Sequence, residues 1–173
     1  MNMIISPKDV LQTQGIDLAT LRDFVEYECS LLDEMRFSEW HELFAEDGIY
    51  WVPAKPGQES GVTHVSLFFD DKPTIKTRVT RLQHPQIHCQ DPLSQCVRVV
   101  SSVRLVAPPI NDVHTVSSRF VMLEDRVGAP QRLFGGRYLH TLRSTSGDGL
   151  EIVEKRVELT NCDQSFPMLT QPF

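Results

Sequence analysis

The sequence predicts an α+β fold, in which helices from the first half of the chain pack against a curved, mainly antiparallel sheet. Two helical patterns come first, at about 17–35 and 38–48, and four strand-like segments occupy most of the chain after residue 97. Short stretches rich in turn residues join those strands. Helices followed by a run of hairpin-connected strands are typical of the α+β class. We therefore expect one sheet that bends around the first helix to form a cone.

The first helix is expected from Asp17 to about Met35. Its apolar side chains recur every three or four residues, which places them on one face of a helix, and Asp17 is a suitable N-cap. A second, short helix is expected to start at Ser38, which can also serve as an N-cap, and to end at Gly48. Trp40 and the apolar residues three and four positions later would form its buried face.

Strand and helix patterns alternate in the next part of the chain. Residues 49–52 are β-branched or aromatic, as is typical of strands. After a loop rich in turn residues, 64–69 form a second predicted strand. Asp70, Asp71 and Pro73 then favour the start of a helix. That helix carries apolar side chains at positions 75, 79 and 82.

Four long strands are expected after that, at 97–106, 116–124, 133–142 and 150–159. In the first of them, Val97, Val99 and Val103 would share one face of the strand. Arg98 and Arg104 would then share the opposite face. The second strand is apolar on both faces, and we therefore expect it to be central in the sheet.

The last two strands carry signs of irregular geometry. Gly135 and Gly136 lie inside the third strand and predict a bulge or a sharp bend there. In the fourth strand the apolar positions change parity, which predicts a bulge near Val153. Between these strands, the Ser-Gly-Asp-Gly segment at 146–149 is typical of a hairpin turn.

The composition is that of a soluble globular protein. Hydrophobic residues make up 40% of the chain and charged residues 23%. The net charge of −6 argues against a nucleic-acid partner. No two of the four cysteines form a C-x-x-C pair, so we expect reduced thiols in the cytoplasm. The cysteines are Cys29, Cys89, Cys96 and Cys162.

The chain is expected to form a single domain, 1–173, with an N-terminal arm at 1–15 and a C-terminal tail at 161–173. The sequence shows neither the pattern of a signal peptide nor an apolar run of the roughly 18 residues that a membrane span requires. We therefore expect a cytoplasmic protein without a membrane partner.

One stretch, LLDEMRFSEWHELFAEDGIYWVPA at 31–54, resembles the small (β) subunit of Rieske-type aromatic-ring-hydroxylating dioxygenases. In that family a helix ending in Leu-Leu-Asp-Glu is followed by an aromatic residue, a helix with Trp, an acidic pair and a Tyr-Trp-x-Pro strand. Weaker similarity continues at 64–82 and 132–144. The matching residues of the strong block are Leu31, Leu32, Asp33, Glu34, Phe37, Trp40, Asp47, Tyr50, Trp51 and Pro53.

The resemblance implies the cystatin-like cone of nuclear-transport-factor-like proteins and an accessory, non-catalytic role. In this family the α subunit holds the Rieske [2Fe–2S] centre and a mononuclear Fe(II). The complex converts an arene into a cis-dihydrodiol with O₂ and electrons from NAD(P)H. The β subunits form a homotrimer that supports three α subunits in a hetero-hexamer. The resemblance therefore implies no cofactor and no metal in this chain.

The residues themselves offer only one local candidate for a metal site. A Rieske cluster needs two Cys and two His in paired motifs, and no cysteine here is followed two positions later by His. His84 and His88 have helical spacing, and Asp91 lies nearby, as an Fe(II) site would require. Pro85 lies between them and argues against a helix. Solvated loop histidines are the simpler interpretation.

The main alternative is a free-standing cone-fold isomerase or hydratase that uses acid–base catalysis in the mouth of the cone. Asp33 can instead fix the loop between the first two helices. The tyrosines at 27 and 138 can instead be packing residues with one bonded hydroxyl. An enzyme of this kind needs an open apolar cavity in which the acid–base groups converge. The candidates for this chemistry are Tyr27, Asp33, Tyr50, His64 and Tyr138.

Arginine recurs along the predicted strands. A solvated sheet face is one interpretation. An interface is the other, because the planar guanidinium forms paired bonds with carboxylates and is enriched at protein contacts. On the second interpretation, each subunit of a trimer would pair these arginines with acidic residues of its neighbour. The residues concerned are Arg98, Arg104, Arg119, Arg126, Arg132, Arg137 and Arg143.

Overall fold

The computed structural model describes residues 16–84, 90–146 and 149–173. Within these ranges it contains three helices and six strands in one sheet, in the order β2-β1-β6-β5-β4-β3. The helices are α1 (Leu18–Asp33), α2 (Phe37–Glu42) and α3 (Lys72–Leu82). The strands are β1 (Phe44–Pro53), β2 (Ser66–Asp71), β3 (Gln95–Leu105), β4 (Val113–Asp125), β5 (Arg132–Ser144) and β6 (Leu150–Leu159).

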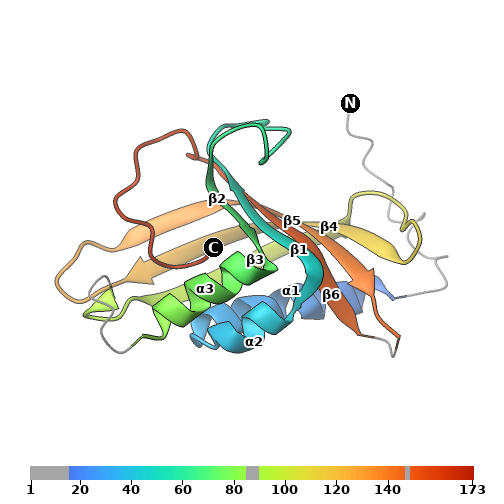
Figure 1. Ribbon diagram of the computed structural model, residues 1–173, viewed down its shortest axis with the longest axis horizontal. Helices are drawn as coiled ribbons and strands as arrows, with labels where there is room; N and C mark the ends of the chain where they lie inside the picture. The colour runs from blue at the N-terminus through green and yellow to red at the C-terminus, as the bar shows by residue number, and fades with distance from the viewer. Residues whose placement is uncertain (1–15, 85–89, 147–148) are drawn as a thin grey trace.

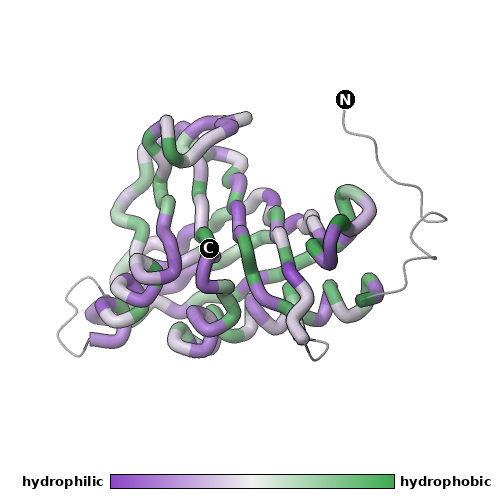
Figure 2. The backbone as a smooth tube through the Cα atoms, turned by 45° about the vertical axis from the view of Figure 1, so that its right-hand side comes forward, coloured by the Kyte–Doolittle hydropathy of each residue, from purple (hydrophilic) through white to green (hydrophobic). Residues whose placement is uncertain are grey.

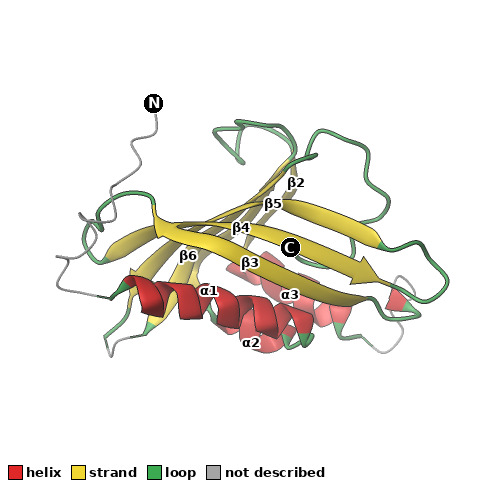
Figure 3. Cartoon of the chain, turned by 180° about the vertical axis from the view of Figure 1, so that it is seen from behind, coloured by secondary structure: helices red, strands yellow, loops and turns green. Residues whose placement is uncertain are grey.

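The sheet is strongly curved, and the described helices lie on one side of it (Figures 1 and 3). Its neighbouring strands pair antiparallel except β1 and β6, which run parallel. The α+β prediction with a mainly antiparallel, curved sheet is therefore confirmed. No helix in the described part of the chain is long and apolar enough to cross a membrane. Hydrophobic and hydrophilic residues instead alternate along the elements (Figure 2).

The core lies between the helices and the inner face of the sheet. Helix α1 begins after Asp17, whose side chain accepts a hydrogen bond from the Thr20 N–H at 2.8 Å, as an N-cap should. Trp40 of α2 is fully buried, and its ring meets those of Phe44 and Tyr50 edge-on at centroid distances of 5.2 and 5.5 Å. The first helix and the burial of Trp40 are thus as predicted, and both pack into the cone.

The predicted limits of the second helix were wrong at both ends. Arg36 occupies the N-cap position of α2 without a side-chain cap, and the Ser38 hydroxyl instead bonds to the Gln83 amide. Gly48 does not end the helix but lies inside β1. A Cβ there would stand 2.8 Å from the carbonyl oxygens of Ala45 and Ile152. Glycine is therefore required for close approach of β1 to β6, and a helix stop signal was the wrong interpretation.

The predicted faces of β3 were also wrong. Val97 and Val99 are exposed, whereas Arg98 between them is buried. The register with β4 shifts between Ser101 and Arg104, and Ser102 has a φ of 55°. Because a one-residue irregularity reverses which side chains face inward, Val103 is buried although it shares parity with the exposed valines. Alternation from a single starting face cannot describe a strand with such a bulge.

The irregularities of β5 and β6 were partly predicted. In the β5–β6 register, Leu142 pairs with Ile152 and Thr141 with Glu154, so Val153 is skipped and the predicted bulge is confirmed. Gly135 and Gly136 pair with β4 without a register shift, so of the two alternatives predicted there, a bulge or a sharp bend, the bulge is absent. The strands that were predicted to begin at 64 and 97 begin instead at Ser66 and Gln95. The hairpin turn at 146–149 lies partly outside the described residues.

Most of the strand arginines have a carboxylate partner in the same chain. Arg98 pairs with Asp33, Arg132 with Glu124, Arg137 with Glu158, and Arg143 with both Asp47 and Glu151. The Arg126 guanidinium donates to the Ser94 hydroxyl at 3.1 Å. The four arginines with carboxylate partners therefore need no neighbouring subunit to order them, and the interface interpretation remains a prediction for the exposed Arg104 and Arg119.

Candidate functional site

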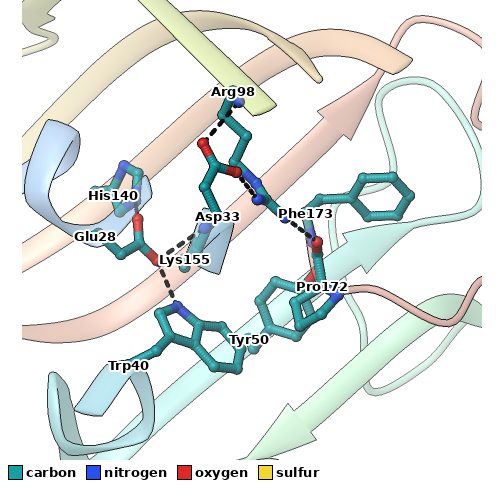
Figure 4. A network of polar contacts seen from close by, with 9 residues as sticks. All are labelled: Glu28, Asp33, Trp40, Tyr50, Arg98, His140, Lys155, Pro172 and Phe173. Carbon is teal, nitrogen blue, oxygen red and sulfur yellow. Dashed lines mark hydrogen bonds and ion pairs between the residues drawn. The ribbon is translucent and has the colours of Figure 1, made fainter. Parts of the chain in front are cut away.

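A network of polar side chains lies inside the cone and joins α1, α2 and two strands (Figure 4). Glu28 of α1 is at its centre. Its Oε1 accepts a hydrogen bond from the Trp40 indole N–H at 2.8 Å and lies 2.8 Å from the Lys155 ammonium. Its Oε2 lies 2.9 Å from Nε2 of His140. Glu28, Trp40, His140 and Lys155 are all fully buried, so the carboxylate is neutralised entirely by protein groups.

The electrostatics of this cluster keep Glu28 ionised. Burial alone would raise the pKa of its carboxyl, but the charge of Lys155 and the contact with His140 lower the pKa well below its usual range. The Lys155 ammonium also lies 4.7 Å from the centre of the Tyr138 ring, a cation–π distance. The geometry therefore favours a fixed ion pair that ties β6 to α1.

A second set of contacts continues toward the tail segment, residues 161–173. Asp33, at the end of α1, accepts from the backbone N–H of Arg98 at 2.8 Å and from its guanidinium. The same guanidinium donates to the Pro172 carbonyl at 2.6 Å. The Phe173 N–H donates to the Tyr50 hydroxyl at 2.9 Å. These bonds connect the end of α1, strands β3 and β1, and the tail segment (Figure 4).

Two tyrosines of the interior hold their protons firmly. Burial raises the pKa of Tyr50 and raises that of Tyr138 well above its ordinary value. The Tyr138 ring stacks on Phe120 at a centroid distance of 3.9 Å, while its hydroxyl has no hydrogen-bond partner among the described residues. Neither phenol is therefore prepared to give up its proton near neutral pH.

The chemistry available here differs from that of an acid–base active site. A general base works best with a pKa near the working pH and must reach its substrate. Glu28 instead has a lowered pKa, is fully buried, and has both oxygens engaged by Trp40, Lys155 and His140. We interpret the network as an electrostatic core that fixes the helices to the sheet.

The structure separates the residues of the predicted catalytic set. Tyr27 is 45% exposed on α1, and His64 is exposed in the loop between β1 and β2. Asp33, Tyr50 and Tyr138 belong to the interior, where the Arg98 charge acts on both tyrosines and pairs with Asp33. The structure thus brings together three of the five candidates, around an arginine that was not among them.

Sequence reasoning missed the centre of the network, although signals for it exist. Glu28 stands three residues after Val25 and four before Leu32, on the buried stripe of α1. Lys155 shares parity with Val157 and Leu159, both of which face inward. A charged residue at a core position marks a buried pair, because an isolated buried charge is strongly disfavoured.

The described residues do not fit an iron–sulfur or metal centre. Where the chain is described, no three His, Cys, Asp or Glu side chains gather as metal ligands. Cys29, Cys96 and Cys162 are buried free thiols, and burial raises the pKa of the first two to about 12 and about 11. Cluster ligands must be thiolates, which burial disfavours. The suggested site at His84 and His88 cannot be assessed, since residue 88 lies outside the described residues.

The outer face of the sheet, opposite the helices, carries a separate candidate surface. Val97 of β3 lies opposite Leu123 of β4, which lies opposite Leu133 of β5, and Val99 lies opposite Val121. These five side chains are between 37% and 69% exposed. We call them the outer ladder. Contiguous exposed apolar side chains of this kind are typical of interaction surfaces.

Comparison with known proteins gives consistent matches. A family model described as ring hydroxylating beta subunit matches residues 27–164. The chain is 29% identical to the benzene 1,2-dioxygenase subunit beta of Pseudomonas putida over 146 residues, which cover 79% of this chain and 78% of that subunit. It is 32% identical over 138 residues to the small oxygenase component of the p-cumate 2,3-dioxygenase system of Pseudomonas putida, covering 79% of this chain and 75% of that protein.

Solved structures agree. The beta subunit of benzoate 1,2-dioxygenase from Burkholderia mallei is similar with a TM-score of 0.72 and 25% identity, over 86% of this chain and 94% of that one. A chain of naphthalene 1,2-dioxygenase is similar in fold with a TM-score of 0.77 and 16% identity, over 99% of this chain and all of that one. The predicted resemblance and cone fold are therefore confirmed.

Proposed function

Because the chain belongs to the ring-hydroxylating beta subunit family, we propose that it is the accessory subunit of an aromatic-ring-hydroxylating dioxygenase and has no catalytic site of its own. The family match over residues 27–164 carries this conclusion. It extends from within α1 to beyond the end of β6, so it includes both the buried network and the outer ladder. A free-standing isomerase would instead require accessible acid–base groups.

The assembled complex performs the proposed reaction. An arene is converted into a cis-dihydrodiol: both atoms of O₂ become hydroxyl groups on adjacent ring carbons, and the two electrons and two protons that this requires come from NAD(P)H and one solvent proton. Names of the similar proteins support an aromatic substrate, since they refer to benzene, p-cumate and benzoate. We place the complex in the cytoplasm, where NAD(P)H is available and buried free thiols such as Cys29 and Cys96 stay reduced.

The cofactors are proposed to lie in the partner α subunit, as a Rieske [2Fe–2S] centre and a mononuclear Fe(II). The described part of this chain supplies no suitable donor set, and its buried thiols favour the protonated form. The contribution of this chain is then mechanical: the Glu28–Lys155 pair fixes α1 to β6 and keeps the cone rigid under the partner.

The proposed assembly is a homotrimer of this chain that supports three α subunits in a hetero-hexamer. The outer ladder supports it, because it offers an apolar surface on the face of the sheet without a described helix. Arg104 and Arg119, both exposed, lie on the strands of this surface and can pair with acidic groups of a neighbour. An obligate interface of this type should bury more than about 800 Å² per partner.

The proposal is tested by reconstitution. The chain purified alone should contain no stoichiometric iron by elemental analysis and should not oxidise an arene such as benzene. Co-expression with its α subunit should give one complex that contains iron and turns over the arene when a reductase and NADH are supplied. Stoichiometric iron in the isolated chain, lost on His84→Ala, would overturn the proposal.

A further inference from the structure

The outer face of the sheet carries charged side chains beside the outer ladder, and several of them are paired within the chain. Arg137 of β5, for example, forms an ion pair with Glu158 of β6. Arg104 of β3, Arg119 of β4 and Glu154 of β6 differ from it. Within the described part of the chain, none of these three side chains forms an ion pair or a hydrogen bond. Their charges are therefore available to another molecule.

Glu154 lies where an unpaired carboxylate is unfavourable. In the sheet it stands between Thr141 of β5 and Ile49 of β1, and neither neighbour carries a charge. The residue is partly buried. Burial raises the pKa of its carboxyl, while the charge of Arg156, two positions along β6, lowers it. A guanidinium brought to this carboxylate would form the charge-assisted hydrogen bonds that it lacks within the chain.

Arg119 has the opposite charge and a matching deficit. It is exposed, and the residue directly opposite it on β5 is Arg137, which has the same charge. Like charges directly opposite each other in a sheet are destabilising. The nearby Glu158 carboxylate is already engaged by Arg137 and Arg156. Since Arg119 lies two residues before Val121 of the outer ladder, a molecule that covers the ladder can supply the missing anion.

Arg119 and Glu154 cannot pair with each other within one chain. In the sheet register, Arg119 lies opposite Arg137, which lies opposite Glu158, four residues beyond Glu154 on β6. Two strand spacings across the sheet and four residues along a strand place Arg119 and Glu154 roughly 16 Å apart. A counter-ion for either residue would have to come from another molecule. A second copy of this chain supplies both, because each copy carries the cation and the anion on the same face.

We propose that Arg119 of one copy pairs with Glu154 of the next copy, so that the contact between copies is heterologous. This inference rests on the proposed homotrimer. Because the two residues are different points of the surface, each copy gives its guanidinium to one neighbour and receives a guanidinium from the other. Three such contacts close a ring. The outer ladder supplies the apolar contact area, and the charged pair sets the orientation in which the copies meet.

Charge reversal in the full chain tests this pairing. Arg119→Glu and Glu154→Lys each place like charges at every contact of the ring. Each change should raise the concentration at which the trimer dissociates at least about tenfold, measured by light scattering and sedimentation over a dilution series. Combining the two changes swaps the charges and should recover most of that loss. Arg22→Glu, at an exposed position of α1, is the matched control and should dissociate like the native chain.

The outcomes separate this pairing from the homotrimer on which it rests. A native chain that is monomeric at micromolar concentration would overturn the homotrimer itself. A trimeric native chain whose single reversals dissociate no more readily than Arg22→Glu would overturn only the pairing. Rescue of Glu154→Lys by Arg104→Glu, and not by Arg119→Glu, would also overturn it. If Glu154→Lys does not fold beside Arg156, Glu154→Gln takes its place and should still weaken the trimer more than the control does.

Discussion

Lys155 is the residue on which the interior most depends. Its ammonium lies 2.8 Å from the Glu28 carboxylate, and neither charged side chain is accessible to solvent. Taking two ions out of water is costly, and their attraction balances this only when the geometry is good. The Trp40 N–H and His140 supply the further bonds to the carboxylate that such a pair requires.

Replacing Lys155 with Met should leave Glu28 buried without its main counter-ion. We expect a loss of about 3–5 kcal/mol in the free energy of unfolding, measured by urea titration. The matched control is Lys72→Met, because Lys72 pairs with Glu46, whose side chain is 94% exposed. That change should cost about 1 kcal/mol or less. Equal losses of unfolding free energy in the two variants would contradict the claim that the buried pair stabilises the fold more than an exposed pair.

The lowered pKa of Glu28 predicts how stability depends on pH. A carboxyl whose pKa is lower in the folded state stabilises the protein fully above its unfolded pKa, near 4.5, and loses this contribution as the pH falls toward the folded value. The difference in unfolding free energy between the native chain and Glu28→Gln should therefore be constant at neutral pH and should shrink below about pH 4.5. Parallel curves down to pH 2.5 would contradict this assignment.

At the scale of elements, the sequence predicted most helices and strands because their patterns are local. The α1 stripe, the Asp71 cap of α3 and the bulge at Val153 all follow from residues close together in the chain. The faces of β3 did not follow, because the bulge after Ser101 reverses them. His140 and Glu28 are 112 residues apart, so no local pattern could have paired them.

Two adjacent glycines of β5 give a matched test of the strand packing. A Cβ at Gly136 would lie 2.1 Å from the carbonyl oxygen of Glu158, on the neighbouring β6, and backbone there cannot move aside easily. A Cβ at Gly135 would stand 3.4 Å from its nearest neighbour, the Phe120 carbonyl oxygen. Gly136→Ala should cost about 1–3 kcal/mol.

The control for that change is Gly135→Ala, which should alter the free energy of unfolding by less than about 1 kcal/mol. Thermal unfolding followed by circular dichroism measures both variants. If Gly135→Ala proves the more damaging of the two, then the β5–β6 approach described above is incorrect.

At the scale of the whole molecule, one face of the sheet is covered by helices, and no described helix covers the other face. The helices lie on the inner side of the sheet (Figure 3). The exposed side chains of the outer ladder belong to the other face. Because the arginines of the strands are mostly paired within the chain, the apolar ladder rather than charge would provide the main driving force for the proposed homotrimer. Arg104 and Arg119 would then contribute specificity.

The most direct test of the accessory-subunit account is the mass of the isolated chain by light scattering at micromolar concentration. The account predicts about three times 19.7 kDa for the native chain and a monomer for Val121→Lys, which places a charge in the middle of the outer ladder. Val62→Lys, at a more exposed loop position outside the outer ladder, should stay trimeric. A monomeric native chain, or a Val121→Lys variant that assembles unchanged, would contradict the account.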